Sequence, residues 1–210
     1  MEMIIQNFTY EDACILIMQT GQPVGDIISE LSNFDDYKTE FLAIKNEKRK
    51  REFLTVRIAM NILMKKNVIV YHDENQKPYL SGCEWKISIS HSRDYVALIA
   101  HPYAEVGIDI ECRTKKVAGV YQRFLNKEEQ TYFYDNENTG LLEVAWSAKE
   151  VLYKILGKKV HDFAGQLHLF PFILKENGTL NAKQTSDFKL YNLHYLQNNK
   201  FTLVYCIDKN

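Results

Sequence analysis

Three acidic side chains and one lysine have the residue types and the spacing that metal and phosphate chemistry needs. Asp109 and Glu111 are two residues apart in the stretch VGIDIE, so a strand there points both carboxylates to one face. Glu150 and Lys154 are four residues apart, so a helix projects both from one side. Converging carboxylates repel unless a cation lies between them, and oxygen-only ligands suit Mg²⁺ or Mn²⁺, which bridge to substrate phosphates. We therefore predict a metal site, with a solvated strand face and a surface Glu–Lys pair as the simpler alternatives.

A second set of residues is suited to bind phosphate. Ser90 and His91 end the alternating segment WKISISH, and side chains where a strand opens into a loop often bind ligands. Basic residues also gather on a predicted helix between residues 45 and 66, and arginine matches phosphate oxygens with two parallel hydrogen bonds. A structural histidine and a solvated basic face are the alternatives. The basic residues are Lys45, Lys48, Arg49, Lys50, Arg51 and Arg57.

Hydrophobic periodicity predicts the helices that position these residues. Apolar residues recur at three and four positions over 44–66 and over 143–159, which is typical of helices packed on a core. Gly157 is placed to end the second of these helices. Asn126 followed by Glu129 is the pattern of a capping box, so a further helix should begin there.

Strands are predicted from alternation and β-branched runs. Segments 85–91, 95–100 and 106–110 are joined by short loops, which favours an antiparallel meander. The C-terminal part is strand-like over 166–174, 188–196 and 200–207, with turn signals at Asn177-Gly178 and Asn198-Asn199. Strands and helices therefore occur in both parts of the chain, and we predict an α+β protein of the broad α/β class.

Composition describes an ordinary globular protein. The chain has 210 residues, 46% of them hydrophobic, and a net charge of −1, which gives no support to nucleic acid or membrane binding. It has no run of apolar residues long enough to span a bilayer, and its N-terminus lacks the pattern of a secretory signal. Four cysteines without CxxC spacing indicate reduced thiols, so we expect a cytoplasmic protein.

Several well-known nucleotide and nucleophile motifs are missing from the sequence. There is no Gly-x-Ser-x-Gly, no GxGxxG and no GxxxxGKS, so neither a nucleophile elbow, a dinucleotide fold nor a P-loop is indicated. Phosphates, if bound, must then be held by basic side chains and a metal.

Taken in order, SHS at 90–92, VGIDIE at 106–111 and WSAKEVLYK at 146–154 resemble the 4′-phosphopantetheinyl transferase superfamily. The family pattern is roughly (I/V)-G-(I/V)-D followed by (F/W)-(S/C/T)-x-K-E-x-x-x-K, and both halves are met. The chain length and Glu111 resemble the longer, Sfp-type branch. Two positions depart from the family: Gln76 stands where glycine is usual before Lys-Pro, and Ser88 where asparagine is usual.

The resemblance implies a fold of two similar α/β halves, residues 1–104 and 105–210. They would be related by a pseudo-two-fold axis, with mostly antiparallel sheets packed on helices and coenzyme A bound in the cleft between the halves. The implied activity is Mg²⁺-dependent transfer of the 4′-phosphopantetheine arm from coenzyme A to a serine of an apo carrier protein, with release of adenosine 3′,5′-bisphosphate. The protein would be a monomer that binds neither nucleic acid nor membrane.

The resemblance also implies residue roles. Asp109, Glu111 and Glu150 would hold Mg²⁺ at the pyrophosphate of coenzyme A. Glu150, directly or through a bound water, would take the proton from the carrier serine, and Lys154 would steady the pyrophosphate. The remaining coenzyme A contacts would be Ser90 and His91 at phosphate groups and Arg51, Arg57 and Lys77 near the 3′-phosphate. The segment 113–140 would meet the carrier, with Tyr121, Phe124 and Leu125 as candidate contacts.

Three other functions fit parts of the pattern. A Mg²⁺-dependent phosphohydrolase could use the same three acids without a carrier protein. A degenerate relative could bind the carrier or coenzyme A without transfer, although Asp109, Glu111, Glu150 and Lys154 are all present. A nucleic-acid binder is disfavoured by the net charge and by the absence of aromatic residues among the basic ones. Fatty-acid, polyketide, peptide-synthetase and lysine-pathway carriers are all compatible with the sequence.

Overall fold

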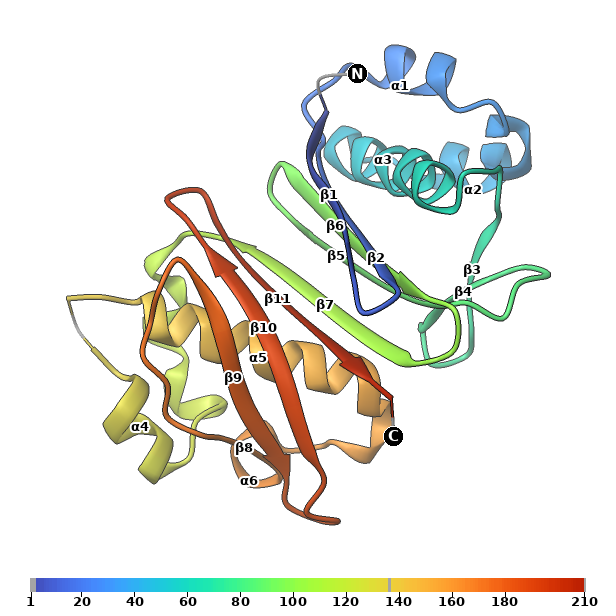
Figure 1. Cartoon of the computed structure of the whole chain (residues 1–210). Helices are drawn as coiled ribbons and strands as arrows, with labels where there is room; N and C mark the ends of the chain where they lie inside the picture. The colour runs from blue at the N-terminus through green and yellow to red at the C-terminus, as the bar shows by residue number, and fades with distance from the viewer. Residues whose placement is uncertain (1–2, 136, 210) are drawn as a thin grey trace. The chain divides into compact units, whose positions relative to one another are not determined.

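The computed structural model describes residues 3–135 and 137–209. The chain divides into two compact units, Met1–Tyr103 (unit 1) and Ala104–Asn210 (unit 2). Each unit pairs one antiparallel sheet with helices (Figure 1), so the predicted α+β class is confirmed. No helix in the described part of the chain is long and apolar enough to cross a membrane.

Unit 1 is a four-stranded antiparallel sheet in the order β1-β2-β6-β5, with α3 packed on β2 and β6 (Figure 1). A separate two-stranded sheet pairs β3 with β4. The strands are β1 (Ile4–Tyr10), β2 (Ala13–Gln19), β3 (Val70–His72), β4 (Pro78–Leu80), β5 (Lys86–Ser92) and β6 (Tyr95–His101). The helices are α1 (Val24–Glu30), the 3₁₀ turn η1 (Phe34–Tyr37), α2 (Lys38–Ala43) and α3 (Glu47–Met64).

The predicted helix over 44–66 corresponds to α3, and local signals set both of its ends. Asn46 caps the N-terminus by accepting a hydrogen bond from the Arg49 backbone N–H, which satisfies one of the exposed first-turn donors. Lys65 ends the helix in the left-handed conformation with φ 54°. Leu54, Ile58 and Met60 between these ends are buried, and Phe53 and Ile62 are half-buried against the same core.

Unit 2 is a five-stranded antiparallel sheet in the order β7-β11-β10-β9-β8, with the long helix α5 packed on β7, β11 and β10 (Figure 1). The strands are β7 (Glu105–Cys112), β8 (Leu167–Leu169), β9 (Asn177–Gln184), β10 (Leu190–Gln197) and β11 (Phe201–Asp208). The helices are α4 (Lys127–Phe133), α5 (Gly140–Leu156) and α6 (Phe163–Gln166). Four 3₁₀ turns occur in the described chain; three lie in this unit, namely η2 (Lys115–Gly119), η3 (Tyr121–Arg123) and η4 (Gly157–Lys159).

Two local predictions in unit 2 are confirmed. Asn126 and Glu129 form the capping box, since the Asn126 side chain accepts from the Glu129 backbone and the Glu129 side chain accepts from the Asn126 backbone. Gly157 follows the last residue of α5 with φ 61°, a conformation that glycine adopts without steric cost.

The predicted meander of 85–91, 95–100 and 106–110 is wrong in its third strand. β5 and β6 pair antiparallel, but β7 pairs with β11 and belongs to the other sheet. A short connection is compatible with a hairpin without requiring one. The partner of β7 is instead the strand Phe201–Asp208, about a hundred residues further along the chain, which local sequence cannot reveal.

The predicted turn at Asn177-Gly178 is also wrong, because β9 begins at Asn177. β9 contains few large apolar residues, so its alternation is weak. Gly178 faces Tyr195 of β10, and a Cβ on Gly178 would come within 2.8 Å of the tyrosine oxygen. The glycine therefore serves close packing between two strands, while the Asn198-Asn199 turn does connect β10 to β11.

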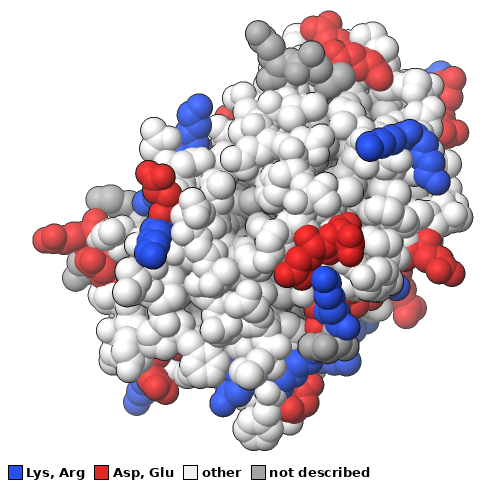
Figure 2. All heavy atoms as spheres, in the orientation of Figure 1, with Lys and Arg blue, Asp and Glu red and all other residues white. Residues whose placement is uncertain are grey.

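Charged side chains of both signs are interspersed on the face that Figure 2 shows, and uncharged surface lies between them. This distribution accords with a net charge of −1.

Candidate functional site

The proposed site lies where α5 crosses β7 in unit 2. β7 presents Gly107, Asp109 and Glu111 on one face, and α5 packs against that face. A Cβ on Gly107 would lie 2.6 Å from the Val151 carbonyl oxygen, so only glycine allows the helix to approach this closely. This contact brings the next residues of both elements together.

Lys154 contacts Asp109 directly. Its Nζ donates to Asp109 Oδ1 at 2.9 Å and to the Ile108 carbonyl at 2.7 Å. The Asp109 side chain is 7% exposed and that of Lys154 is 26% exposed. The ion pair is thus largely shielded from water. The spacing on the helix suggested Glu150 as the partner of Lys154, but Lys154 forms its ion pair with Asp109 on β7.

Glu150 has a strongly perturbed carboxyl group. Burial, together with the negative charges of Asp109 and Glu111, raises its pKa to about 7, and the positive charge of Lys154 opposes this shift. The neighbouring carboxylates penalise the ionisation of Glu150 because its environment is poorly solvated. Glu150 therefore interacts electrostatically with Asp109, Glu111 and Lys154, and their role as one metal site stays a prediction.

The carboxylates of Asp109, Glu111 and Glu150 are of the chemical type that binds a divalent cation, but they are not already arranged as a coordination shell. Three carboxylates whose charges repel one another are the ligands that Mg²⁺ takes. Within residues 3–135 and 137–209, however, no three His, Cys, Asp or Glu side chains are already gathered closely enough to hold a metal. The Lys154 ammonium supplies the positive charge at Asp109.

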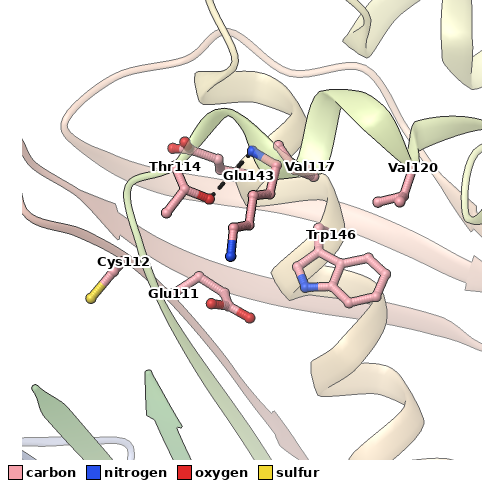
Figure 3. A pocket seen from close by; sticks show the side chains of 8 residues that line it. Glu111, Cys112, Thr114, Val117, Val120, Glu143 and Trp146 are labelled. Carbon is pink, nitrogen blue, oxygen red and sulfur yellow. Dashed lines mark hydrogen bonds between the residues drawn. The ribbon is translucent and has the colours of Figure 1, made fainter. Parts of the chain in front are cut away.

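A pocket of about 260 Å³ opens beside Glu111 (Figure 3). Trp146 from α5 and Val117 and Val120 from the η2 segment form its apolar lining, and the carboxylate of Glu111 borders it. An apolar space bordered by a few polar groups is typical of small-molecule sites. The other lining residues are Cys112, Thr114, Lys116 and Glu143.

Glu143 is fixed at the edge of this pocket by a buried network. Arg113 Nε lies 2.6 Å from Glu143 Oε2, and Thr202 and Gln197 each donate to the same oxygen at 3.4 Å. Burial raises the pKa of Glu143, although Arg113 partly offsets this effect. Glu143 is therefore bound within the unit, and it was not among the residues predicted for the site.

Lys149, the lysine of the WSAKE motif, has a structural role. Its Nζ is fully buried and donates to Glu129 Oε2 at 2.7 Å, to the Phe124 carbonyl at 2.6 Å and to the Phe163 carbonyl at 3.1 Å. Glu129 Oε1 in turn accepts from the Leu169 backbone N–H. One enclosed ion pair thus ties α5 to the segments before α4, at α6 and at β8.

The candidate carrier contacts differ in their accessibility. Phe124 and Leu125 are each 1% exposed and belong to the apolar core of unit 2, so their prediction as carrier contacts is wrong. Both side chains pack inward because they are apolar and complete this core, where Phe124 meets Trp146 of α5 edge to face. Tyr121 is half-buried and stacks on Tyr134, and its role stays a prediction.

In unit 1 the predicted phosphate ligand His91 belongs to a charged cluster with α3. Arg49 Nη1 lies 2.6 Å from His91 Nε2, and His91 Nδ1 lies 3.5 Å from Glu52 Oε2. Glu52 also pairs with Arg49 at 3.2 Å and with Lys48 at 3.8 Å. The sequence placed Arg49 in the basic cluster proposed to bind phosphate but did not pair it with His91, and Glu52 was not among the predicted site residues.

Arg57, predicted near the 3′-phosphate, is enclosed within unit 1. Its guanidinium lies over the Phe53 ring at 3.5 Å and the Tyr37 ring at 4.9 Å, and Nη2 pairs with Glu40 at 3.5 Å. Burial lowers the pKa of Arg57 to about 10, and its buried Nε has no hydrogen-bond partner. Cation–π contacts and one ion pair account for its position. Its assignment to coenzyme A stays a prediction.

The other predicted coenzyme A contacts occupy different environments. Arg51 on α3 and Lys77 before β4 are half-buried, while Ser90 is 6% exposed on β5. The Lys77 backbone N–H donates to Asp73 Oδ1, which fixes the loop that carries the lysine.

Most of unit 2 matches a known protein family. Residues 105–206, which include β7, α5 and the pocket, match the family profile described as the 4'-phosphopantetheinyl transferase superfamily. Residues 105–206 thus form a domain of this superfamily, and the two sheet-and-helix units of the chain are consistent with the Sfp-type, pseudo-dimeric branch. A search of curated proteins found no match.

Proposed function

We propose that the protein transfers the 4′-phosphopantetheine arm of coenzyme A to a serine of an apo carrier protein. The observation that carries this proposal is the α5–β7 contact, which sets Glu150 and Lys154 against Asp109 within the segment that matches the family. A buried carboxyl with a pKa near 7 is suited to accept a proton at neutral pH.

The chemistry is a single displacement at phosphorus. The carrier serine Oγ attacks the phosphorus atom that bears the pantetheine arm, its proton passes to the Glu150 carboxylate, and the bond to the leaving phosphate of adenosine 3′,5′-bisphosphate breaks. Lys154 binds the pyrophosphate oxygens and so stabilises charge on the leaving group. Asp109, Glu111 and Glu150 would hold Mg²⁺, which supplies charge neutralisation at the pyrophosphate.

The pocket beside Glu111 has a place in this proposal. Its volume of about 260 Å³ and its Trp146, Val117 and Val120 lining suit the uncharged pantetheine arm. Binding the arm there would orient the pyrophosphate toward the carboxylates of β7 and α5, and such orientation lowers the barrier by reducing the entropy lost on reaction. Ser90, His91, Arg51, Arg57 and Lys77 remain the proposed ligands of coenzyme A phosphates.

A cytoplasmic location and an apo carrier as protein partner belong to the same proposal. The four cysteines are free thiols, as a reducing compartment requires.

The test is direct transfer. The protein is incubated with coenzyme A, Mg²⁺ and a panel of apo carriers, and each carrier is weighed by mass spectrometry. We expect one carrier class to gain a phosphopantetheine group in a reaction that a chelator abolishes. Coenzyme A cleaved at equal rate with and without a carrier would instead indicate a phosphohydrolase.

Two variants sharpen this test. Glu150→Gln should lower transfer by at least about a hundredfold, because the proton acceptor and a metal ligand are lost. Glu30→Gln, the same change at an exposed position in α1, is the matched control and should transfer normally. Near-normal transfer by Glu150→Gln would remove the proposed role of Glu150.

A further inference from the structure

Glu52 is an acid buried beneath a surface cluster of basic groups in unit 1. Its side chain is 8% exposed, whereas those of Lys48, Arg49 and His91 are 49%, 57% and 38% exposed. All three surface groups lie within ion-pairing distance of the Glu52 carboxylate. The carboxylate therefore lies behind the basic groups and leaves part of each in contact with solvent.

The cluster dictates which ring nitrogen of His91 carries the proton. A guanidinium has only N–H donors and stays protonated, so the 2.6 Å contact from Arg49 Nη1 requires His91 Nε2 to accept. The proton of the neutral ring is then on Nδ1, which faces Glu52 Oε2 at 3.5 Å. Glu52 thus contacts both members of the Arg49–His91 pair and opposes rotation of either side chain.

We propose that Glu52 is a positioning residue that holds His91 against Arg49 and so orients Arg49 to bind a phosphate group of coenzyme A. This inference rests on the proposed function, since it takes coenzyme A as the ligand. Arg49 keeps further N–H donors on its exposed guanidinium for the phosphate oxygens, while Glu52 fixes the direction in which the guanidinium points.

A positioning role and a purely electrostatic role of Glu52 predict opposite changes in coenzyme A affinity when its charge is removed. If Glu52 only added negative charge near the phosphate, its removal would strengthen coenzyme A binding through reduced repulsion. If Glu52 orients the pair, its removal weakens binding despite the gain in positive charge. The sign of the change therefore separates the two roles.

The first measurement needs no coenzyme A. Histidine ¹⁵N shifts at about pH 8, above the unperturbed pKa of an imidazole, distinguish a proton on Nδ1 from one on Nε2. We expect His91 of the wild-type protein to carry the proton on Nδ1 and to lose this preference in Glu52→Gln. A wild-type His91 protonated on Nε2 would overturn the proposed arrangement.

The second measurement compares ligand affinity in matched variants. Glu52→Gln should raise the KM for coenzyme A about tenfold and leave kcat within about twofold, because the phosphate contact is made in both ground and transition states. Glu52→Asp should restore part of this loss. Glu47→Gln is the control: it makes the same change on the same helix, at a side chain that is 64% exposed and pairs with Lys50, and it should leave KM unchanged.

The outcomes separate this inference from the proposed function. An unchanged or lower KM in Glu52→Gln overturns the positioning role while transfer persists. If no carrier is modified by the wild-type protein, the proposed function fails, and calorimetric binding of adenosine 3′,5′-bisphosphate to Glu52→Gln and Glu47→Gln then tests the inference without transfer. If Glu52→Gln does not fold, Arg49→Lys serves as the substitute variant. It keeps the positive charge but loses the paired N–H donors of arginine, and it should weaken binding of adenosine 3′,5′-bisphosphate.

Discussion

At the scale of single residues, the behaviour of the site depends on how three carboxylates share one lysine. Lys154 contacts Asp109 at 2.9 Å, while burial and the negative charges of Asp109 and Glu111 raise the pKa of Glu150 to about 7 against the opposing effect of Lys154. Asp109 thus has a direct contact with the ammonium, whereas the carboxyl of Glu150 lies in a poorly solvated environment with two negative neighbours. Such divergence is what acid–base chemistry uses.

A pH dependence of stability follows in the absence of metal. Because the pKa of Glu150 is raised from 4.5 to about 7 in the folded protein, the folded state binds more protons than the unfolded state between these values. The free energy of unfolding should therefore fall as pH rises through this window. Urea unfolding in the presence of a chelator checks this, and Glu150→Gln should flatten the slope.

Magnesium provides the complement to that experiment. If the carboxylates bind Mg²⁺, adding it at about pH 8 should restore stability to the wild-type protein by mass action. The Glu150→Gln protein should respond less. An equal response of both proteins would place the binding of Mg²⁺ elsewhere.

The residue types of the site were predictable, and its contacts only in part. Asp109, Glu111, Glu150 and Lys154 were found from spacing and family resemblance, and the structure brings them into electrostatic contact. The partner of Lys154 was not predictable, because an i,i+4 pattern on a helix favours Glu150 while the lysine side chain reaches across to β7. Glu52 was overlooked because its significance depends on His91, 39 residues away in the sequence.

At the scale of elements, the distance between α5 and β7 is set by one glycine. Gly107 lies under the Val151 carbonyl, and no side chain fits between them. The closeness of this contact is what allows Lys154 to reach both Asp109 and the Ile108 carbonyl.

Gly107→Ala should therefore separate helix and strand. We expect a loss of about 1–3 kcal/mol in the free energy of unfolding, from overpacking, together with a loss of transfer activity. Gly25→Ala is the comparison: nothing lies within 4 Å of its added Cβ, and alanine within α1 should stabilise by up to about 1 kcal/mol. Chemical denaturation of both variants measures the contrast, and equal stabilities would contradict the close-approach argument.

The buried Lys149–Glu129 pair holds several short elements in place. The segment 113–140 contains only one short α-helix and two 3₁₀ turns in its described residues, so little regular hydrogen bonding supports it. Lys149 supplies bonds to the Phe124 and Phe163 carbonyls. Burial lowers the pKa of Lys149, and Glu129 opposes this effect.

Lys149→Met should cost about 3–5 kcal/mol, because Glu129 would be left as a buried charge without its partner. Lys158→Met, at an exposed residue of η4, should change stability by less than about 0.5 kcal/mol. Urea unfolding gives both values. A small effect at Lys149 would mean that water or rearrangement compensates Glu129.

Element predictions succeeded where the signal was local. The capping box at Asn126 and the glycine end of α5 depend on residues a few positions apart. The placement of β7 and the existence of β9 depend on distant partners, Phe201–Asp208 for the first and β8 and β10 for the second. Strand pairing is decided by such tertiary contacts, which spacing along one strand does not contain.

At the scale of the whole molecule, the two units have separate apolar cores. One core gathers around α3 and the β2–β6 pair, and the other around α5 and the β9–β11 strands. The α+β class was predictable because both patterns recur along the chain. The relation of the halves by a pseudo-two-fold axis and the boundary between residues 104 and 105 stay predictions.

Each unit carries one of the two tryptophans, Trp85 in the first and Trp146 in the second. Trp85→Phe and Trp146→Phe therefore leave a single fluorophore in unit 2 and in unit 1, respectively. Because the proposed Mg²⁺ ligands all lie in unit 2, Mg²⁺ should raise the thermal midpoint reported by Trp146. The midpoint reported by Trp85 should stay constant. Equal shifts at both tryptophans would show that the two cores unfold together.

The enclosure of Lys149 has a consequence for chemical labelling. An amine with no exposed surface cannot meet an acylating reagent while the surrounding segments are closed, so brief treatment of the native protein should modify surface lysines and spare this one. The slow rate of acylation at Lys149 would then report how often the segments around α5 open, at the level of one residue and without a spectroscopic probe.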